Sequence, residues 1–279
     1  MTKIPYFIGA GSGNTFIVVD NRRNLITNPN QFAAKECKSS NSGGIDGVLF
    51  IEKPKETQTD FFMRIVNSDG SEAEACGNGY RVVGLYAHKH LNFPKLISVG
   101  TLAGTVRINV ASEEAIKVNM IDPTDYREKI EMKLKTKTWN GAFINTGVPH
   151  VVIFVDELDP FPVKEMGREI RYHENFKPKG TNVNFVKVEG KNKLSIRTYE
   201  RGVEDETLAC GTGSVAAAVI ANLNGKVKVP VDVFPKSGEK LKVYFERCGN
   251  NVTHVSLEGP AKEKSRGKIN LGDWNGTNP

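Results

Sequence analysis

The sequence predicts an α+β protein made of two similar halves. Its 279 residues suffice for one large domain or two of ordinary size. Short segments typical of strands are numerous and helical segments are few, which favours antiparallel-rich sheets wrapped around helices. One pattern occurs twice: a strand, an acidic turn, Cys-Gly-x-Gly and a helix, with its cysteines at Cys76 and Cys210.

The elements follow from this repeat. The first copy predicts a strand over residues 61–67 and a helix over 80–89, and the second a strand over 194–200 and an Ala-rich helix over 214–223. The remaining predicted strands are residues 16–20, 48–51, 105–110, 116–120, 151–155, 183–188, 231–234, 241–245 and 252–257. The turn at Asp122-Pro123 predicts a boundary between a first half, 1–121, and a second, 122–266. The tail 267–279 is expected to pack on the first half.

Composition excludes several classes of protein. Hydrophobic residues make up 39% and charged residues 25%, as in folded globular proteins. The net charge is +6, and the densest basic segments, 133–137 and 262–268, contain no aromatic residue on which a base could stack, so no nucleic-acid partner is expected. No apolar run is long enough for a membrane helix and no secretory core begins the chain, so a cytoplasmic protein is expected.

The four cysteines do not form a metal or disulfide pattern. There is no Cys-x-x-Cys pair, so neither zinc nor a structural disulfide is expected. Cys37 and Cys248 lack a glycine box and are interpreted as small buried hydrophobic residues.

The glycine-rich segment Gly9–Gly13 does not fit a nucleotide-binding loop. Such a loop needs a full strand before it and a helix after it. Here a strand over residues 15–20 follows, and only a short segment is expected to precede.

Cys-Gly-x-Gly at the start of a helix suits a small anion. Glycines let backbone N–H groups approach a carboxylate, and the first N–H groups of a helix have no internal partner. A helix end contributes about 0.3–1 kcal/mol, which lowers a thiol pKa by less than about one unit, so a thiolate base needs a further proton acceptor.

Two such cysteines on facing halves would flank one carbon. One thiolate could remove a proton and the opposite thiol return one, which inverts a stereocentre without a cofactor.

The chain resembles the diaminopimelate epimerases, the pyridoxal-independent epimerases of lysine and peptidoglycan precursor synthesis. Six motifs carry the resemblance in order. They are Gly11-Ser12-Gly13-Asn14-Thr15-Phe16, Asn67-Ser68-Asp69-Gly70-Ser71 with Cys76-Gly77-Asn78-Gly79 and Arg81, Thr146-Gly147-Val148-Pro149-His150, Gly180-Thr181-Asn182-Val183, Glu200-Arg201-Gly202 with the box at Cys210, and Leu257-Glu258-Gly259-Pro260-Ala261.

The resemblance implies a fold and a site. The fold would be two pseudo-symmetric halves, each a barrel-like, mostly antiparallel sheet around a central helix, with the active site in the cleft between them. Cys76 and Cys210 would be the acid/base residues, and His150 and Glu200 the neighbours that take protons from the thiols. The implied substrate-binding residues are Asn14, Asn67, Gly77, Asn78, Asn182, Glu200, Arg201, Gly211 and Thr212. Diaminopimelate would be the partner molecule, with no metal or other cofactor, and the protein would form a homodimer.

Two departures from the family pattern leave substrate breadth open. Val148 stands where the family usually has Asn, and one extra residue separates Glu200 from Cys210. Val148 motivates the hypothesis of relaxed selectivity toward smaller acidic amino acids such as glutamate. A proline or hydroxyproline racemase is the alternative enzyme, which the polar residues Asn67, Asn182 and Arg201 disfavour. A non-catalytic binding protein of the same fold is the other alternative, and the presence of both cysteines argues against it.

Overall fold

From a computed structural model of the protein we describe residues 3–38, 44–135 and 137–270. The chain divides into two compact units. The first unit runs to Val118 and resumes at Gly259, and the second spans Asn119–Glu258. Of the predicted tail 267–279, residues 271–279 lie outside the described residues.

The first unit is a single curved sheet with strand order β18-β1-β2-β3-β4-β6-β7-β8. The pairs β2–β3 and β4–β6 are parallel and the others are antiparallel, while the short β5 pairs with β4. The strands are β1 (Lys3–Gly11), β2 (Asn14–Asp20), β3 (Gly47–Glu52), β4 (Phe61–Asn67), β5 (Glu72–Ala73), β6 (Leu96–Thr101), β7 (Gly104–Ser112), β8 (Ala115–Asn119) and β18 (Lys262–Asn270).

The sheet of the first unit wraps around one helix. Helix α2 (Gly77–His90) contacts β1, β2, β3 and β7, which lie toward opposite ends of the strand order. One helix can touch both ends only if the sheet curves around it, and residues 78–87 of α2 are all buried. Helix α1 (Pro29–Glu36) contacts β3 and β4, so the central strands are covered on both faces and read as continuous apolar runs.

The second unit repeats this plan element for element. Its order is β9-β10-β11-β12-β13-β15-β16-β17, with β11–β12 and β13–β15 parallel and the short β14 paired with β13. The strands are β9 (Thr124–Lys133), β10 (Thr138–Asn145), β11 (Pro149–Phe154), β12 (Asn182–Gly190), β13 (Lys193–Glu200), β14 (Asp205–Thr207), β15 (Val231–Phe234), β16 (Leu241–Cys248) and β17 (Asn251–Gly259). The predicted α+β fold of two similar units is thereby confirmed.

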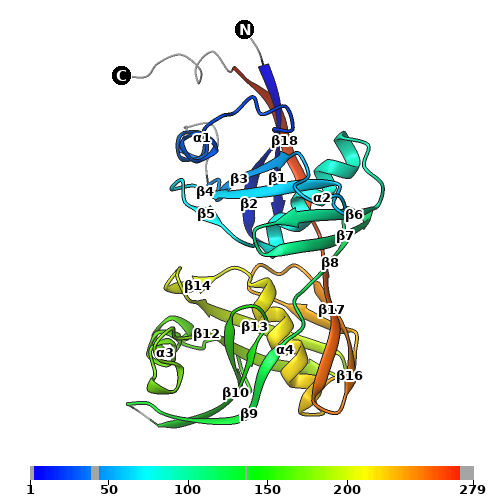
Figure 1. Cartoon of the computed structure of the whole chain (residues 1–279). Helices are drawn as coiled ribbons and strands as arrows, with labels where there is room; N and C mark the ends of the chain where they lie inside the picture. The colour runs from blue at the N-terminus through cyan, green and yellow to red at the C-terminus, as the bar shows by residue number, and fades with distance from the viewer. Residues whose placement is uncertain (1–2, 39–43, 136, 271–279) are drawn as a thin grey trace. The chain divides into compact units, whose positions relative to one another are not determined.

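Helix α4 (Gly211–Leu223) occupies the centre of the second unit, as α2 does in the first (Figure 1). It contacts strands from β10 to β16, and residues 213–221 are all buried. A helix that is apolar on every side belongs inside a core, and the small side chains of Ala216, Ala217 and Ala218 let strands approach it closely. Helix α3 (Val163–Arg171), followed by a 3₁₀ turn at Glu174–Phe176, covers the opposite face at β12 and β13.

The structure corrects part of the sequence prediction. Residues 3–11 form a full strand, β1, so the expectation of only a short segment before Gly13 was wrong. A strand, β2, follows the turn as predicted, so this is a β-hairpin and not a nucleotide loop. Strands β5, β6, β9, β10, β14 and β18 were not predicted, and β14 begins within the second predicted acidic turn.

No helix within residues 3–38, 44–135 and 137–270 combines the length and apolar character needed to cross a membrane.

Gly167 on α3 allows that helix to lie directly on β13. A methyl group added there would lie 2.6 Å from Tyr199 Cγ, beside Glu200. We expect Gly167→Ala to lower the free energy of unfolding by about 1–3 kcal/mol, because a packed core does not absorb an extra carbon. Urea unfolding followed by circular dichroism measures this. Gly190→Ala is the control, since a methyl group there meets nothing within 4 Å; equal stability of the two variants would contradict the prediction.

Candidate functional site

A cysteine is the N-cap residue of the central helix in each unit. Cys76 precedes α2 with φ −152° and ψ 103°, and Cys210 precedes α4 with φ −123° and ψ 114°. The Cys76 sulfur accepts a hydrogen bond from the Gly79 N–H at 3.3 Å. Each sulfur therefore lies at a helix N-terminus, where unsatisfied N–H groups favour negative charge.

The second glycine of each Cys-Gly-x-Gly box is closely packed, and at Gly213 a side chain would clash. A Cβ at Gly213 would lie 2.5 Å from Asn184 Oδ1 and 3.3 Å from the Cys210 sulfur. A Cβ at Gly79 would lie 3.3 Å from Leu49 and Met63 side-chain atoms. The first glycines differ from each other, because a Cβ at Gly211 would lie 3.2 Å from Leu257 Cδ2, whereas a Cβ at Gly77 would meet nothing within 4 Å. The helix start at Gly77 is thus open for a group to approach its backbone.

In the first unit a polar network joins the helix start to the β1–β2 hairpin. Asn78 Nδ2 donates to Asn14 Oδ1 at 2.8 Å. The fully buried guanidinium of Arg81 donates to Asn78 Oδ1 at 2.9 Å, to Ser12 Oγ at 2.6 Å and to the Pro260 carbonyl at 3.2 Å. The network fixes Asn14 and Asn78, two of the four asparagines that the family resemblance assigns to substrate.

The hairpin turn itself positions Asn14. Ser12 and Gly13 both have positive φ, 48° and 89°, and Gly11 pairs with Asn14 across the strands. A two-residue turn with both residues in this region matches the right-handed twist of the flanking strands. Asn14 is therefore held as the first residue of β2.

In the second unit a chain of buried and half-buried side chains leads to Cys210. His150 Nε2 lies 3.0 Å from Thr212 Oγ1, and Thr212 Oγ1 lies 3.4 Å from the Cys210 sulfur. His150 Nδ1 lies 3.1 Å from Asn184 Nδ2, and both residues are completely buried. The predicted residues Cys210, Thr212 and His150 are thus brought together, with the Thr212 hydroxyl between the imidazole and the thiol.

The electrostatic surroundings keep the Cys210 thiol and the His150 imidazole neutral. Burial, reinforced by the charge of Glu200, raises the pKa of the Cys210 thiol to about 12, against the opposing effect of hydrogen bonds from Thr212 and Gly213. Burial, reinforced by the positive charge of Arg201, lowers the pKa of His150 to about 3. Burial also raises the pKa of Glu200, the last residue of β13. At neutral pH Cys210 is therefore a thiol and His150 a neutral imidazole.

The other predicted ligand-binding residues lie at the ends of strands or, in the case of Gly211, at the start of a helix. Asn182, the first residue of β12, donates to the Pro149 carbonyl at 3.1 Å and accepts from the Arg201 N–H at 2.8 Å, so its amide fixes two predicted segments. Asn67, the last residue of β4, donates to Ser71 Oγ at 3.0 Å. Gly211 opens α4 and is partly exposed.

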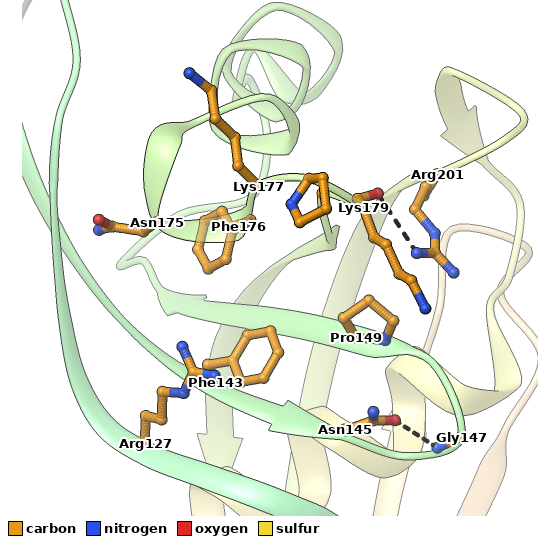
Figure 2. A pocket seen from close by; sticks show the side chains of 12 residues that line it. Arg127, Phe143, Asn145, Gly147, Pro149, Asn175, Phe176, Lys177, Lys179 and Arg201 are labelled. Carbon is orange, nitrogen blue, oxygen red and sulfur yellow. Dashed lines mark hydrogen bonds between the residues drawn. The ribbon is translucent and has the colours of Figure 1, made fainter.

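A basic pocket of about 350 Å³ adjoins Arg201 within the second unit. Figure 2 shows Arg201, Lys179 and Lys177 along one side, with Asn145, the last residue of β10, and Gly147 of the β10–β11 loop below. Arg201 Nη1 donates to the Lys179 carbonyl at 3.5 Å, which holds the guanidinium at the pocket. The concentration of positive charge favours an anionic group.

Both departures from the family pattern lie in tight loops. Val148 is half-buried in the loop between β10 and β11, where Gly147 has φ 98° and its N–H donates to Asn145 Oδ1. The segment between Glu200 and Cys210 begins with a loop in which Gly202 and Glu204 have positive φ, after which β14 pairs with β13. The positive φ of these two residues lets the chain reverse direction within this loop, so that β14 can pair with β13.

The remaining cysteines differ from each other. Cys37 is half-buried, and burial raises its pKa to about 11. Cys248 is exposed, so its interpretation as a buried hydrophobic residue was wrong; it ends β16 where that strand leaves the core. None of the four cysteines is in a disulfide. Across the described residues, no three His, Cys, Asp or Glu side chains gather as a metal site would require.

Arg81 and Asn184 organise the two helix starts, and sequence reasoning gave neither a role. Each is a polar residue in an apolar run, Arg81 beside Val82 and Val83, and Asn184 between Val183 and Phe185. Burial of such a group is unfavourable unless it is hydrogen-bonded, so polar residues in core elements are a signal that sequence alone offers.

The buried neutral state of His150 has a consequence for stability. Between about pH 6.5 and pH 3 the unfolded chain binds a proton on this residue that the folded chain does not, so stability falls as pH falls, by up to about 1.4 kcal/mol per pH unit. We expect the stability difference between wild type and His150→Asn to shrink as pH falls from 7.5 to 4.5. Urea unfolding at several pH values measures it. The control is His254→Asn, at an exposed position; a constant difference for His150→Asn would refute the prediction.

Solved structures with this fold include a PhzF-family protein and a hydroxyproline epimerase. A phenazine biosynthesis protein of the PhzF family from Bacillus anthracis matches with TM-score 0.71 at 16% identity, over 96% of this chain and 99% of that one. A hydroxyproline epimerase from Agrobacterium vitis matches with TM-score 0.70 at 14% identity, over 96% and 92%. At these identities the likeness concerns the fold.

Sequence comparison is more specific. The family model for diaminopimelate epimerase matches residues 6–125 and 142–263, which include both cysteine boxes. The diaminopimelate epimerase of Hydrogenobaculum sp. (strain Y04AAS1) is 44% identical over 270 residues, 93% of this chain and 96% of that protein. That of Aquifex aeolicus is 38% identical over 269 residues, 93% and 95%. With two matched units, each opening its central helix with a cysteine, the chain belongs to the diaminopimelate epimerase family.

Proposed function

We propose that the protein interconverts LL- and meso-diaminopimelate by inverting the α-carbon, without a cofactor, in lysine and peptidoglycan precursor synthesis. One observation carries the proposal: each unit sets a cysteine at the N-terminus of its buried helix. Relatives that bear the name diaminopimelate epimerase, at up to 44% identity over nearly the whole chain, support the substrate.

The mechanism uses Cys76 and Cys210 as a pair. The thiolate of one removes the α-proton, and the electron pair passes into the carboxylate as an enediolate. The thiol of the other gives its proton to the opposite face of the carbon, so the first cysteine ends as a thiol and the second as a thiolate. The proposal requires the two units to face each other across one substrate.

The substrate carboxylate is assigned to the two helix starts. Backbone N–H groups of Gly77, Asn78, Gly211 and Thr212 would receive it, and their fixed dipoles would hold the enediolate charge as it develops. One donor of this kind typically contributes about 10²–10³ in rate. Glu200 is assigned as the proton acceptor near Cys210, since its charge already acts on that thiol.

The distal amino and carboxylate groups are assigned to the polar residues at the strand ends. Arg201, beside Lys179 at the basic pocket, suits a carboxylate through a bidentate contact. Asn14, Asn67 and Asn182 supply amides for the rest of the molecule. A cytoplasmic location and a homodimer remain predictions from the sequence.

Heavy water tests the two-cysteine mechanism. We expect purified protein with LL-diaminopimelate in D₂O to produce the meso isomer and to incorporate deuterium at the α-carbon, because the returning proton comes from a thiol that has exchanged with solvent. Cys76→Ala and Cys210→Ala should each lose epimerisation by several orders of magnitude while keeping the circular dichroism of wild type. Cys248→Ala, at an exposed position, is the matched control and should retain full activity.

Normal epimerisation by either of the first two variants would exclude the pair. A protein that binds diaminopimelate without deuterium exchange would be a binding protein. Addition of pyridoxal phosphate or EDTA should leave the rate unchanged.

A substrate panel tests the consequence of Val148. Because an apolar side chain stands where the family has an amide, we expect slow racemisation of L-glutamate by the wild type and a lower glutamate rate in Val148→Asn. Circular dichroism of L-glutamate, L-proline and diaminopimelate reactions measures the rates. Activity confined to diaminopimelate in the wild type would refute relaxed selectivity, and fast proline racemisation would favour the alternative enzyme.

A further inference from the structure

Asn184, a buried residue of β12, contacts Nδ1 of the His150 imidazole, whereas Thr212 contacts Nε2. Its Nδ2 lies 3.1 Å from His150 Nδ1 and 3.0 Å from the Val151 carbonyl, and its Oδ1 lies 3.0 Å from Thr198 Oγ1. Both Asn184 and His150 have no exposed surface. This amide is not among the residues that the family motifs assign to substrate or to proton transfer.

The orientation of the Asn184 amide is fixed by the Val151 carbonyl. A carbonyl oxygen can only accept, so the amide atom that faces it must be the NH₂ group. The second hydrogen of the same NH₂ points to His150 Nδ1, and Thr198 donates its hydroxyl to the Oδ1 atom on the other side. His150 Nδ1 must therefore be an acceptor, which leaves the ring proton of the neutral imidazole on Nε2.

The position of that proton sets the direction of the remaining hydrogen bonds. His150 Nε2–H donates to Thr212 Oγ1 at 3.0 Å, so the single hydroxyl proton of Thr212 is free to point at the Cys210 sulfur, 3.4 Å away. In the other tautomer, Nε2 would accept the Thr212 proton and this route would offer the sulfur no donor. A thiolate can only accept, and hydrogen bonds to a charged acceptor are the stronger ones.

We propose that Asn184 is a positioning residue that holds His150 in its Nε2–H tautomer, so that His150 and Thr212 form a donor chain that stabilises the Cys210 thiolate. His150 then acts toward this cysteine as a hydrogen-bond donor, and the proton that leaves the thiol goes to Glu200. The inference rests on the proposed function, because it concerns how one of the two cysteines becomes a base.

The wild-type protein tests the tautomer directly. Two-bond ¹H–¹⁵N correlation spectra of the full chain labelled with ¹⁵N-histidine distinguish protonated from unprotonated ring nitrogens, and the His150 signals are those that His150→Asn removes. We expect Nε2 protonated and Nδ1 unprotonated at pH 7. A protonated Nδ1 would overturn the inference, whether or not the protein epimerises diaminopimelate.

Asn184→Asp tests the link to catalysis. A carboxylate accepts from Nδ1–H, so this variant should move the ring proton to Nδ1 and turn the Thr212 hydroxyl away from the sulfur. We expect kcat for diaminopimelate epimerisation to fall about 10- to 100-fold, and the apparent pKa of the catalytic base in the pH profile of kcat/KM to rise by about one unit. A ring proton on Nδ1 with unchanged kcat and unchanged pH profile would overturn the role in catalysis.

Asn21→Asp is the matched control. Asn21 is buried in the first unit, where its Nδ2 donates to the Ile26 carbonyl and its Oδ1 accepts from the Ile26 N–H. This variant carries the same chemical change and a comparable folding penalty, and it should leave the His150 spectrum and the pH profile as in wild type. A like shift of the pH profile in both variants would assign the effect to general destabilisation and overturn the proposal.

The tautomer assignment and the proposed function can be refuted independently of each other. If the purified protein does not epimerise diaminopimelate while Nε2 carries the proton, the proposed function fails and the tautomer assignment stands. If it epimerises while Nδ1 carries the proton, the inference alone fails. Where Asn184→Asp does not fold, Thr212→Val removes the hydroxyl link and should raise the same apparent pKa without changing the His150 tautomer; an unchanged pKa would overturn the inference.

Discussion

The N-terminus of a buried helix is the constraint on which each unit depends. The first N–H groups of any helix lack internal partners, and burying them without partners is costly. Here the sheet wraps around α2 and α4, so their first turns need acceptors in a crowded place. At α2 the Cys76 sulfur meets that need by accepting from the Gly79 N–H, and in both helices the glycine three residues after the cysteine leaves room for the sulfur and for neighbouring side chains. The part of the helix N-terminus that remains accessible is suited to binding a carboxylate.

The two units share a fold and differ in the chemistry behind the helix start. The second residue after the cysteine is Asn78 in the first unit, bound by Asn14 of β2, and Thr212 in the second, bound by His150 of β11. The fifth residue is the buried Arg81 in one and Val215 in the other. One helix start is therefore organised around a buried cation and the other around a neutral imidazole. The two helix starts thus have the same architecture and different electrostatic surroundings. This difference fits the proposal that one thiol removes a proton and the other returns one.

The sequence alone predicted the repeat, both central helices and their cysteines, because Cys-Gly-x-Gly and the alternating strands before it are local patterns. It missed β1, whose Pro5, Gly9 and Gly11 weaken a strand pattern, and β18, whose residues are mostly charged and exposed and show no apolar alternation. The motifs included His150, Thr212 and Arg81 but not Asn184, and the contacts through which Asn184 and Arg81 act form only in the folded chain. Long-range hydrogen bonds of buried polar groups leave no periodic trace in a sequence.

The strand β18 has a consequence for synthesis of the chain. It pairs with β1 along most of its length and occupies in the first unit the place that β9 holds in the second. The second unit is continuous in sequence, so its strands emerge from the ribosome one after another without interruption. The sheet of the first unit begins with β1 and receives its last strand, β18, only about 250 residues later. The portion translated first is therefore completed last, and a chain truncated before residue 262 leaves β1 with an unpaired edge of the kind that promotes association.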